Sequence, residues 1–255
     1  MQCDTADVVN RLQSPQTRDA TIDGCDPIDV GVISTLDLNR HGGLETYVRS
    51  LTTALVSGGM SVKWNGQPPN GPYQFDPKWA TLNRRLLSLM TRSRLRWMSR
   101  RIAESVGNRL CETWLGRTRV MHYVGTGWTL LGFPAVRAAR RRGLVSTCWP
   151  AIHPEQWGDN ELDFDLYSKM DAIFVQSDFE KDLFVSRGID SERLVRCDLA
   201  PSVPMTGNGE AFIQRHCLGG RQLILFLGRK CELKGYHAVR RAVALTSQCG
   251  RPVTL

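Results

Sequence analysis

The sequence predicts an α/β protein built from doubly wound, Rossmann-like units, because short apolar runs alternate with amphipathic segments across glycine or polar turns. Two stretches show this alternation most clearly. Residues 29–64 follow the order strand, glycine turn, helix and strand, and residues 223–255 repeat that order. Ligands of such sheets bind at the carboxyl ends of the parallel strands, so the turns that follow strands are the first candidates for function.

The composition is that of a basic globular chain. The 255 residues are 42% hydrophobic and 23% charged, and the net charge of +8 favours an anionic partner. The eight cysteines contain no C-x-x-C pair, which predicts a reducing compartment and no metal site. The sequence shows no signal-peptide core, no transmembrane stretch and no nucleic-acid-binding pattern, so we expect a cytoplasmic protein without a nucleic-acid partner.

The first elements open a doubly wound unit. Residues 1–27 are polar and predict a flexible tail. A strand over residues 29–34 precedes a turn that contains Gly42 and Gly43, and a helix follows from Leu44 to the Gly58-Gly59 pair. A second strand is predicted over residues 60–64. A plain turn between strand and helix is the alternative to a ligand-binding glycine loop.

A strongly basic segment follows over residues 78–101. It carries Lys78 and seven arginines without an acid, and apolar residues recur at helical spacing from Leu82 to Leu110. Such a basic amphipathic helix can lie on an anionic membrane surface. The alternative is an ordinary solvated helix face.

The middle of the chain repeats strands and helices. Strands are predicted over residues 119–125, 144–149, 171–177 and 194–197, with helices over 130–142, interrupted near Pro134, and over 165–170. A further helix opens at Asp178, with Ser177 or Asp178 as its N-cap. His153 lies in the polar loop after one of these strands, which makes it a candidate site residue, and a purely structural histidine is the alternative.

A proline- and glycine-rich stretch over residues 199–209 predicts a domain boundary, which divides the chain into residues 28–200 and 201–255. Beyond it, Leu223–Leu227 predicts a strand buried on both faces, followed by Gly228 and by a helix that ends near Cys249. Arg229 and Lys234 would lie between that strand and the helix N-terminus, where two cations suit a diphosphate. A surface turn that happens to carry two cations is the alternative.

These motifs, taken in order, resemble the GT-B glycosyltransferases of the family 4 type, and the resemblance covers residues 28–255. No single motif carries it, but four occur in the family's order. They are Gly42-Gly43-x-Glu45, Pro150-x-x-His153-Pro154, the block from Asp171-Ala172 through Gln176-Ser177 to Glu180, and Gly228-Arg229-x4-Lys234-Gly235.

The resemblance implies a retaining glycosyltransferase of glycan or polysaccharide biosynthesis, with a UDP- or GDP-sugar donor, an unidentified acceptor and no cofactor or metal. His153 would be catalytic, beside the transferred sugar in the interdomain cleft. Arg229 and Lys234 would bind the donor diphosphate, and Gly42 and Gly43 would form the glycine loop of the cleft. Further cleft positions implied by the family are Glu45, Ser177, Glu180 and Gly228.

The family's second domain also carries an E-x7-E motif, and no such pair follows Lys234. We therefore expect residues 201–255 to be a linker and the truncated start of a donor domain, and the chain to be an inactive fragment. One alternative is a non-catalytic module. It would bind either an acceptor or the inner face of an anionic membrane. Another is a related phosphate enzyme such as a sugar epimerase.

Overall fold

The computed structural model of the protein describes residues 28–34, 43–64, 96–126, 131–155, 157–198, 206–220, 222–228, 230–251 and 253–255. The chain divides into two compact units, Met1–Ser202 (unit 1) and Val203–Leu255 (unit 2). Each unit is considered by itself.

Unit 1 contains a six-stranded parallel sheet with the strand order β2-β1-β3-β4-β5-β6. Because every pair is parallel, the carboxyl ends of all six strands meet at one edge of the sheet. The strands are β1 (Ile28–Ser34), β2 (Val62–Trp64), β3 (Thr118–Val124), β4 (Val145–Trp149), β5 (Ala172–Val175) and β6 (Leu194–Arg196).

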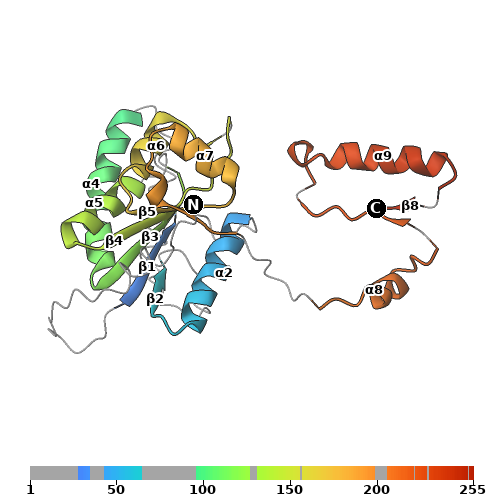
Figure 1. Ribbon diagram of the computed structural model, residues 1–255, viewed down its shortest axis with the longest axis horizontal. Helices are drawn as coiled ribbons and strands as arrows, with labels where there is room; N and C mark the ends of the chain where they lie inside the picture. Colours follow the sequence, from blue (N-terminus) through green and yellow to red (C-terminus); the bar gives the residue numbers. More distant parts are fainter. Residues whose placement is uncertain are drawn as a thin grey trace. The chain divides into compact units, whose positions relative to one another are not determined.

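Helices cover both faces of this sheet, as doubly wound topology requires (Figure 1). One face packs against α2 (Gly43–Ser57) through Val32 and Val48. The opposite face packs against the remaining helices of unit 1. These are α4 (Arg96–Leu115), α5 (Gly132–Arg142), α6 (Glu161–Tyr167) and α7 (Asp178–Ser186), and a 3₁₀ turn, η1 (Ser191–Arg193), precedes β6.

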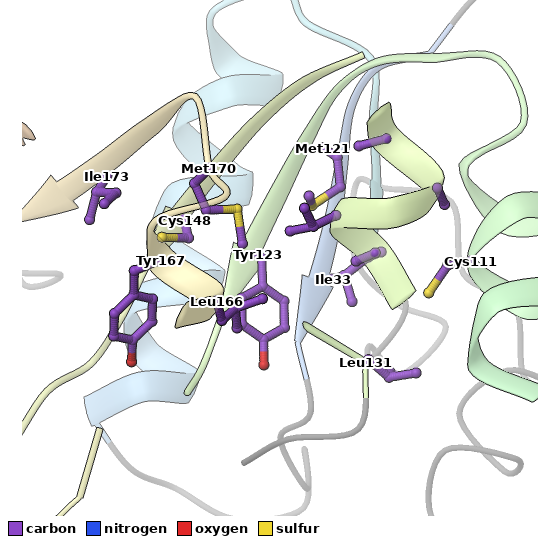
Figure 2. Close-up of a cluster of buried hydrophobic side chains, with 14 of the residues drawn as sticks. Ile33, Cys111, Met121, Tyr123, Leu131, Cys148, Leu166, Tyr167, Met170 and Ile173 are labelled. Carbon is purple, nitrogen blue, oxygen red and sulfur yellow. The ribbon is translucent and has the colours of Figure 1, made fainter. Parts of the chain in front are cut away.

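The core of unit 1 lies mainly between the sheet and α4 to α7. Alternate strand residues point into it, so Ile33, Tyr123 and Ile173 belong to this cluster, whereas Val32 belongs to the cluster under α2. Figure 2 shows the strand residues of the larger cluster facing Leu166 and Tyr167 of α6. The strands are therefore buried on both faces, as their continuous apolar runs predict.

Two predicted helices differ from those observed. The predicted break near Pro134 is wrong, because α5 is continuous; Pro134 lies in its first turn, where backbone N–H groups need no partner within the helix. The predicted helix over residues 165–170 begins earlier, at Glu161. Asn160 accepts a hydrogen bond from Asp163 N–H, and the Asp163 carboxylate accepts one from Asn160 N–H, at 3.1 and 3.3 Å. This reciprocal capping box sets the start of α6.

Unit 2 holds one βαβ unit preceded by a short helix. The strands β7 and β8 pair in parallel, with Leu223 opposite Thr254, and α9 connects them. The elements are α8 (Gly209–Arg215), β7 (Gln222–Leu223), the 3₁₀ turn η2 (Glu232–Lys234), α9 (Tyr236–Gln248) and β8 (Val253–Thr254).

The prediction that Leu223–Leu227 is a strand buried on both faces is wrong. The observed strand β7 ends at Leu223, and Leu225 and Leu227 are 67% and 85% exposed. A strand is buried on both faces only where neighbouring strands and helices cover it. Within the described part of unit 2, the strand paired with β7 is β8, which is only 2 residues long.

Candidate functional site

The candidate site of unit 1 lies at the carboxyl edge of its sheet, where the turns after three strands carry predicted site residues. Gly43 begins α2 after β1, His153 follows β4, and Ser177 with Glu180 follows β5. Gly42 and the side chain of Glu45 lie outside the part of the chain that the structure describes, so their predicted roles stay predictions.

The loop after β4, residues 150–158, is called the β4 loop here and carries two aromatic residues at the surface. His153 and Trp157 exchange two backbone hydrogen bonds of 2.9 Å each, which close the chain into a tight turn. Their rings lie 4.1 Å apart, between centroids, at an interplanar angle of 52°. His153 is an exposed residue, and Trp157 is 45% exposed.

Two buried tyrosines contact the backbone of this loop and of the turn after β3. The Tyr167 hydroxyl, in α6, lies 3.4 Å from the Pro150 carbonyl and 3.3 Å from the Gly158 carbonyl, so it faces both ends of the β4 loop. The Tyr123 hydroxyl donates a 2.8 Å hydrogen bond to the carbonyl of Thr126, in the turn after β3. Figure 2 shows the two hydroxyl groups pointing in the same direction. Burial raises the pKa of both phenols, so both remain protonated donors.

Gly158 packs the end of the β4 loop tightly against its surroundings. Its φ is 82°, and a Cβ there would lie 3.2 Å from Thr126 Cγ2 and 3.3 Å from the Cα of Ile152. A side chain at this position would meet both a left-handed backbone conformation and a steric conflict. A larger residue at position 158 would therefore force the end of the loop to move.

The start of α2 contacts the end of β4 through two aromatic rings. Tyr47 stacks on Trp149 with centroids 3.8 Å apart and an interplanar angle of 27°. This contact places the beginning of α2 at the same edge of the sheet as the β4 loop. Burial raises the pKa of the Tyr47 phenol, which excludes a role for it as a base near neutral pH.

Ser177 and Glu180 make capping contacts at the start of α7. The Ser177 hydroxyl accepts from Glu180 N–H at 3.2 Å, and the Glu180 carboxylate accepts from Gln176 N–H at 2.6 Å. The expectation that Ser177 or Asp178 is the N-cap is confirmed for Ser177. The contribution of either side chain to ligand binding stays a prediction.

The candidate anion site of unit 2 surrounds the start of α9. Lys234 is exposed at the end of η2, and Gly235, with a φ of 70°, leads directly into the helix. Lys230 Nζ and Arg240 Cζ lie 5.7 and 5.9 Å from the centroid of the Tyr236 ring. The first turn of α9 carries no acidic residue, so this end of the helix is electropositive. Gly228 lies in the turn before it, and Arg229 lies outside the described residues.

Neither a metal centre nor a membrane span is found among the residues that the structure describes. No group of three or more His, Cys, Asp or Glu side chains there is arranged to hold a metal ion. No described helix is both long and apolar enough to cross a membrane.

Comparison with known proteins identifies the fold but no family. No family model matches the sequence, and no curated protein matches it. The structure is similar to the UDP complex of Alr3699/HepE from Anabaena, with 10% identity over 86% of this chain and 58% of that one and a TM-score of 0.50. It is also similar to the apo form of the lipopolysaccharide outer core galactosyltransferase WaaB, with 11% identity, 89% and 67% coverage and a TM-score of 0.50. A third similar structure is the UDP complex of S. aureus MnaA, with 12% identity, 89% and 61% coverage and a TM-score of 0.51.

These similarities confirm the predicted α/β, GT-B-like fold class. At such low identity they show the fold alone, and the chain spans 58% of the length of the HepE structure. The residue roles implied by the family resemblance are therefore taken up below as proposals.

Sequence reasoning missed Trp157 and Tyr167 as parts of the candidate site. Trp157 lies in a polar loop between Glu155 and Gly158, where no periodicity marks it. A tryptophan in a polar turn after a predicted strand could nevertheless have indicated a binding site. A large ring in such a turn is seldom needed for packing of the core. Tyr167 could only be assigned once α6 was placed over the sheet.

Proposed function

We propose that the protein binds a nucleotide-diphosphate sugar and transfers its sugar to an acceptor with retention of configuration. The observation that carries this proposal is the basic start of α9, where Lys230 and Arg240 lie beside the Tyr236 ring and Lys234 is exposed at the end of the preceding η2 turn. Such an arrangement favours a diphosphate. Similar folds that hold UDP, in HepE and MnaA, support a uridine nucleotide in particular.

In this proposal, residues 28–200 form the acceptor-side domain and residues 201–255 belong to the donor side. Arg229 and Lys234 neutralise charge on the departing diphosphate, a form of electrostatic stabilisation that lowers the barrier to transfer. His153 lies beside the transferred sugar and donates or accepts a hydrogen bond to it. Gly42, Gly43 and Gly228 allow the backbone to approach the ligand closely, while Glu45, Ser177 and Glu180 complete the polar surface of the site.

Contact with an anionic membrane surface stays a separate prediction, because residues 78–95 of the basic segment 78–101 and the side chains of its remaining residues lie outside the described part of the chain. The basic end of α5 gives it little support. Arg140 and Arg142 donate to the backbone carbonyls of Lys169 and Gly116, and Arg141 pairs with Glu112 at 2.5 Å. These cations already have partners within the protein.

Replacing the diphosphate-binding cations tests the proposal directly. We expect Arg229→Ala and Lys234→Ala each to weaken UDP binding by about 1.5–3 kcal/mol, the contribution of a hydrogen bond to a charged group. Isothermal titration calorimetry measures the change. Arg251→Ala is the matched control, because Arg251 is an exposed cation of unit 2 that lies beyond α9 and should leave the affinity unchanged. Equal affinities of the three variants and the wild type would contradict the proposal.

A second experiment tests His153. In a full-length version of the protein, we expect His153→Ala to lower kcat by about five- to tenfold, since one hydrogen bond to the reacting sugar contributes about 1–1.5 kcal/mol. The melting temperature should change little, because the tight turn is closed by the backbone of His153 and the residue is exposed. Chromatography of the products separates transfer from epimerisation, since only transfer yields a glycosylated acceptor. Loss of the folded state in His153→Ala would assign the side chain a structural role instead.

A further inference from the structure

We propose that the exposed rings of Trp157 and His153 form a stacking platform for the pyranose ring of a neutral saccharide. The inference builds on the proposed function and specifies it, because it assigns the acceptor to the class of carbohydrates. It concerns the loop after β4, and the key residue, Trp157, is not part of any motif of the family resemblance.

The stacking platform is preformed, because hydrogen bonds fix the backbone of the loop. The two backbone hydrogen bonds between His153 and Trp157 fix their separation, and their rings are tilted by 52°, so the indole is not fully covered by the imidazole. The Tyr167 hydroxyl faces the carbonyls at both ends of the loop, Pro150 and Gly158. A surface fixed in this way loses little conformational freedom when a ligand binds.

The chemistry of the two rings matches that of a sugar. A tryptophan that is 45% exposed keeps a large apolar surface in water, and covering it with another apolar surface is favourable. A pyranose ring offers apolar C–H groups on its faces and hydroxyl groups around its edge. The indole can pack against the face of the sugar, and the imidazole lies beside it with its ring centroid 4.1 Å away.

The residues of the loop favour a neutral ligand over a phosphate. Residues 155–165 contain five acids and neither lysine nor arginine, in a chain whose net charge is +8. The acids are Glu155, Asp159, Glu161, Asp163 and Asp165. Asp163 is buried in the α6 capping box and Asp165 pairs with Lys169, but residues 150–161 contain no Lys or Arg that could bind a phosphate, whereas the start of α9 in unit 2 carries several. The two chemistries are thus separated along the chain, with a saccharide at the β4 loop and the nucleotide diphosphate at α9.

The test follows the indole N–H signals of the seven tryptophans by NMR in the intact chain, with methyl β-D-glucopyranoside as the probe. The Trp157 signal is assigned by its loss in Trp157→Phe. We expect that signal to shift on titration with a millimolar dissociation constant, while the signals of the other tryptophans stay in place. Trp157→Ala should raise the dissociation constant, followed by saturation-transfer signals of the sugar, by about tenfold or more. Trp157→Phe should retain most of the binding.

Phe179→Ala is the matched control, because Phe179 is a 65% exposed aromatic residue on α7 that belongs to no proposed site. It should bind the probe as the wild type does. The platform is overturned if the Trp157 signal does not move with the sugar, or if Trp157→Ala binds it unchanged. A Trp157 shift of similar size with tetramethylammonium chloride would overturn it in favour of a cation-binding site, since the acids and the indole suit a cation as well.

UDP titrated into the same samples separates this inference from the proposed function. UDP binding that is retained in Trp157→Ala, together with loss of sugar binding, supports both. A sugar response without UDP binding contradicts the donor-binding proposal and leaves the platform standing. UDP binding without a sugar response contradicts the platform alone.

Discussion

Phe184→Ala is expected to lower the free energy of unfolding of unit 1 by about 3–5 kcal/mol, the loss typical of a buried phenylalanine. Phe184 of α7 is fully buried. Its ring lies 5.3 Å from that of Phe164 and 5.4 Å from that of Tyr167, between centroids, and packs edge-on or tilted against both. Truncation removes these contacts and leaves a cavity that rigid aromatic neighbours cannot fill.

Urea denaturation measures this loss, and the same helix supplies its control. Phe179→Ala removes an equally large ring that is 65% exposed, so its effect should stay within about 0.5 kcal/mol. A loss below about 1 kcal/mol for Phe184→Ala, with an unchanged dependence on urea, would contradict the packing described here. Because Phe184 supports Tyr167, the variant should also weaken sugar binding at the β4 loop.

Acidification is expected to destabilise the protein by about 3 kcal/mol through His122 alone. His122 lies on β3, is 4% exposed, and its Nδ1 lies 2.8 Å from Thr147 Oγ1. Its Nε2 has no hydrogen-bond partner among the described residues. Burial lowers the pKa of His122 from 6.5 to about 4, because a charged imidazole in this position would lose its hydration.

The direction of the effect follows from the two protonation states. Between pH 6.5 and about pH 4 the unfolded chain binds a proton at this histidine and the folded chain does not. The stability that His122 contributes is therefore present above pH 6.5, decreases as the pH falls through this window, and is lost below about pH 4.

Urea unfolding at a series of pH values across this window measures the slope for the wild type and for His122→Phe. The variant keeps a ring of similar size at this position but cannot take up a proton, so its stability should fall less steeply with acid. Carboxylates that titrate in the same range contribute equally to both proteins and cancel in the difference. Identical slopes would mean that His122 does not titrate with a lowered pKa.

The strands of unit 1 could be predicted from sequence because each one is encoded locally. The runs at residues 29–34, 119–125 and 144–149 are apolar, rich in β-branched residues and bounded by polar or glycine turns. The cap of α7 was readable in the same way, from Ser177 and the Glu180 that follows it. The start of α6 was also encoded, in Asn160 and Asp163, although the prediction placed it later.

Burial in unit 2 could not be predicted, since it depends on what lies next to a strand and not on the strand itself. The run Leu223–Leu227 is as apolar as those of unit 1, yet Leu225 and Leu227 are exposed in the described structure. The conformation of the β4 loop could not be predicted from the sequence either. Glu155 has a positive φ within the turn that joins His153 to Trp157, and Tyr167 reaches the loop from a separate helix.

The attachment of the β4 loop to the core constrains how its ligand preference can evolve. Because Tyr167, Gly158 and the paired backbone of His153 and Trp157 fix the shape of the loop, a change in its conformation would disturb the packed interior of unit 1. New preferences are therefore accessible through the exposed side chains at positions 153 and 157, which can be exchanged without moving the backbone. The core thus maintains the shape of the loop, while the two exposed positions can take other side chains.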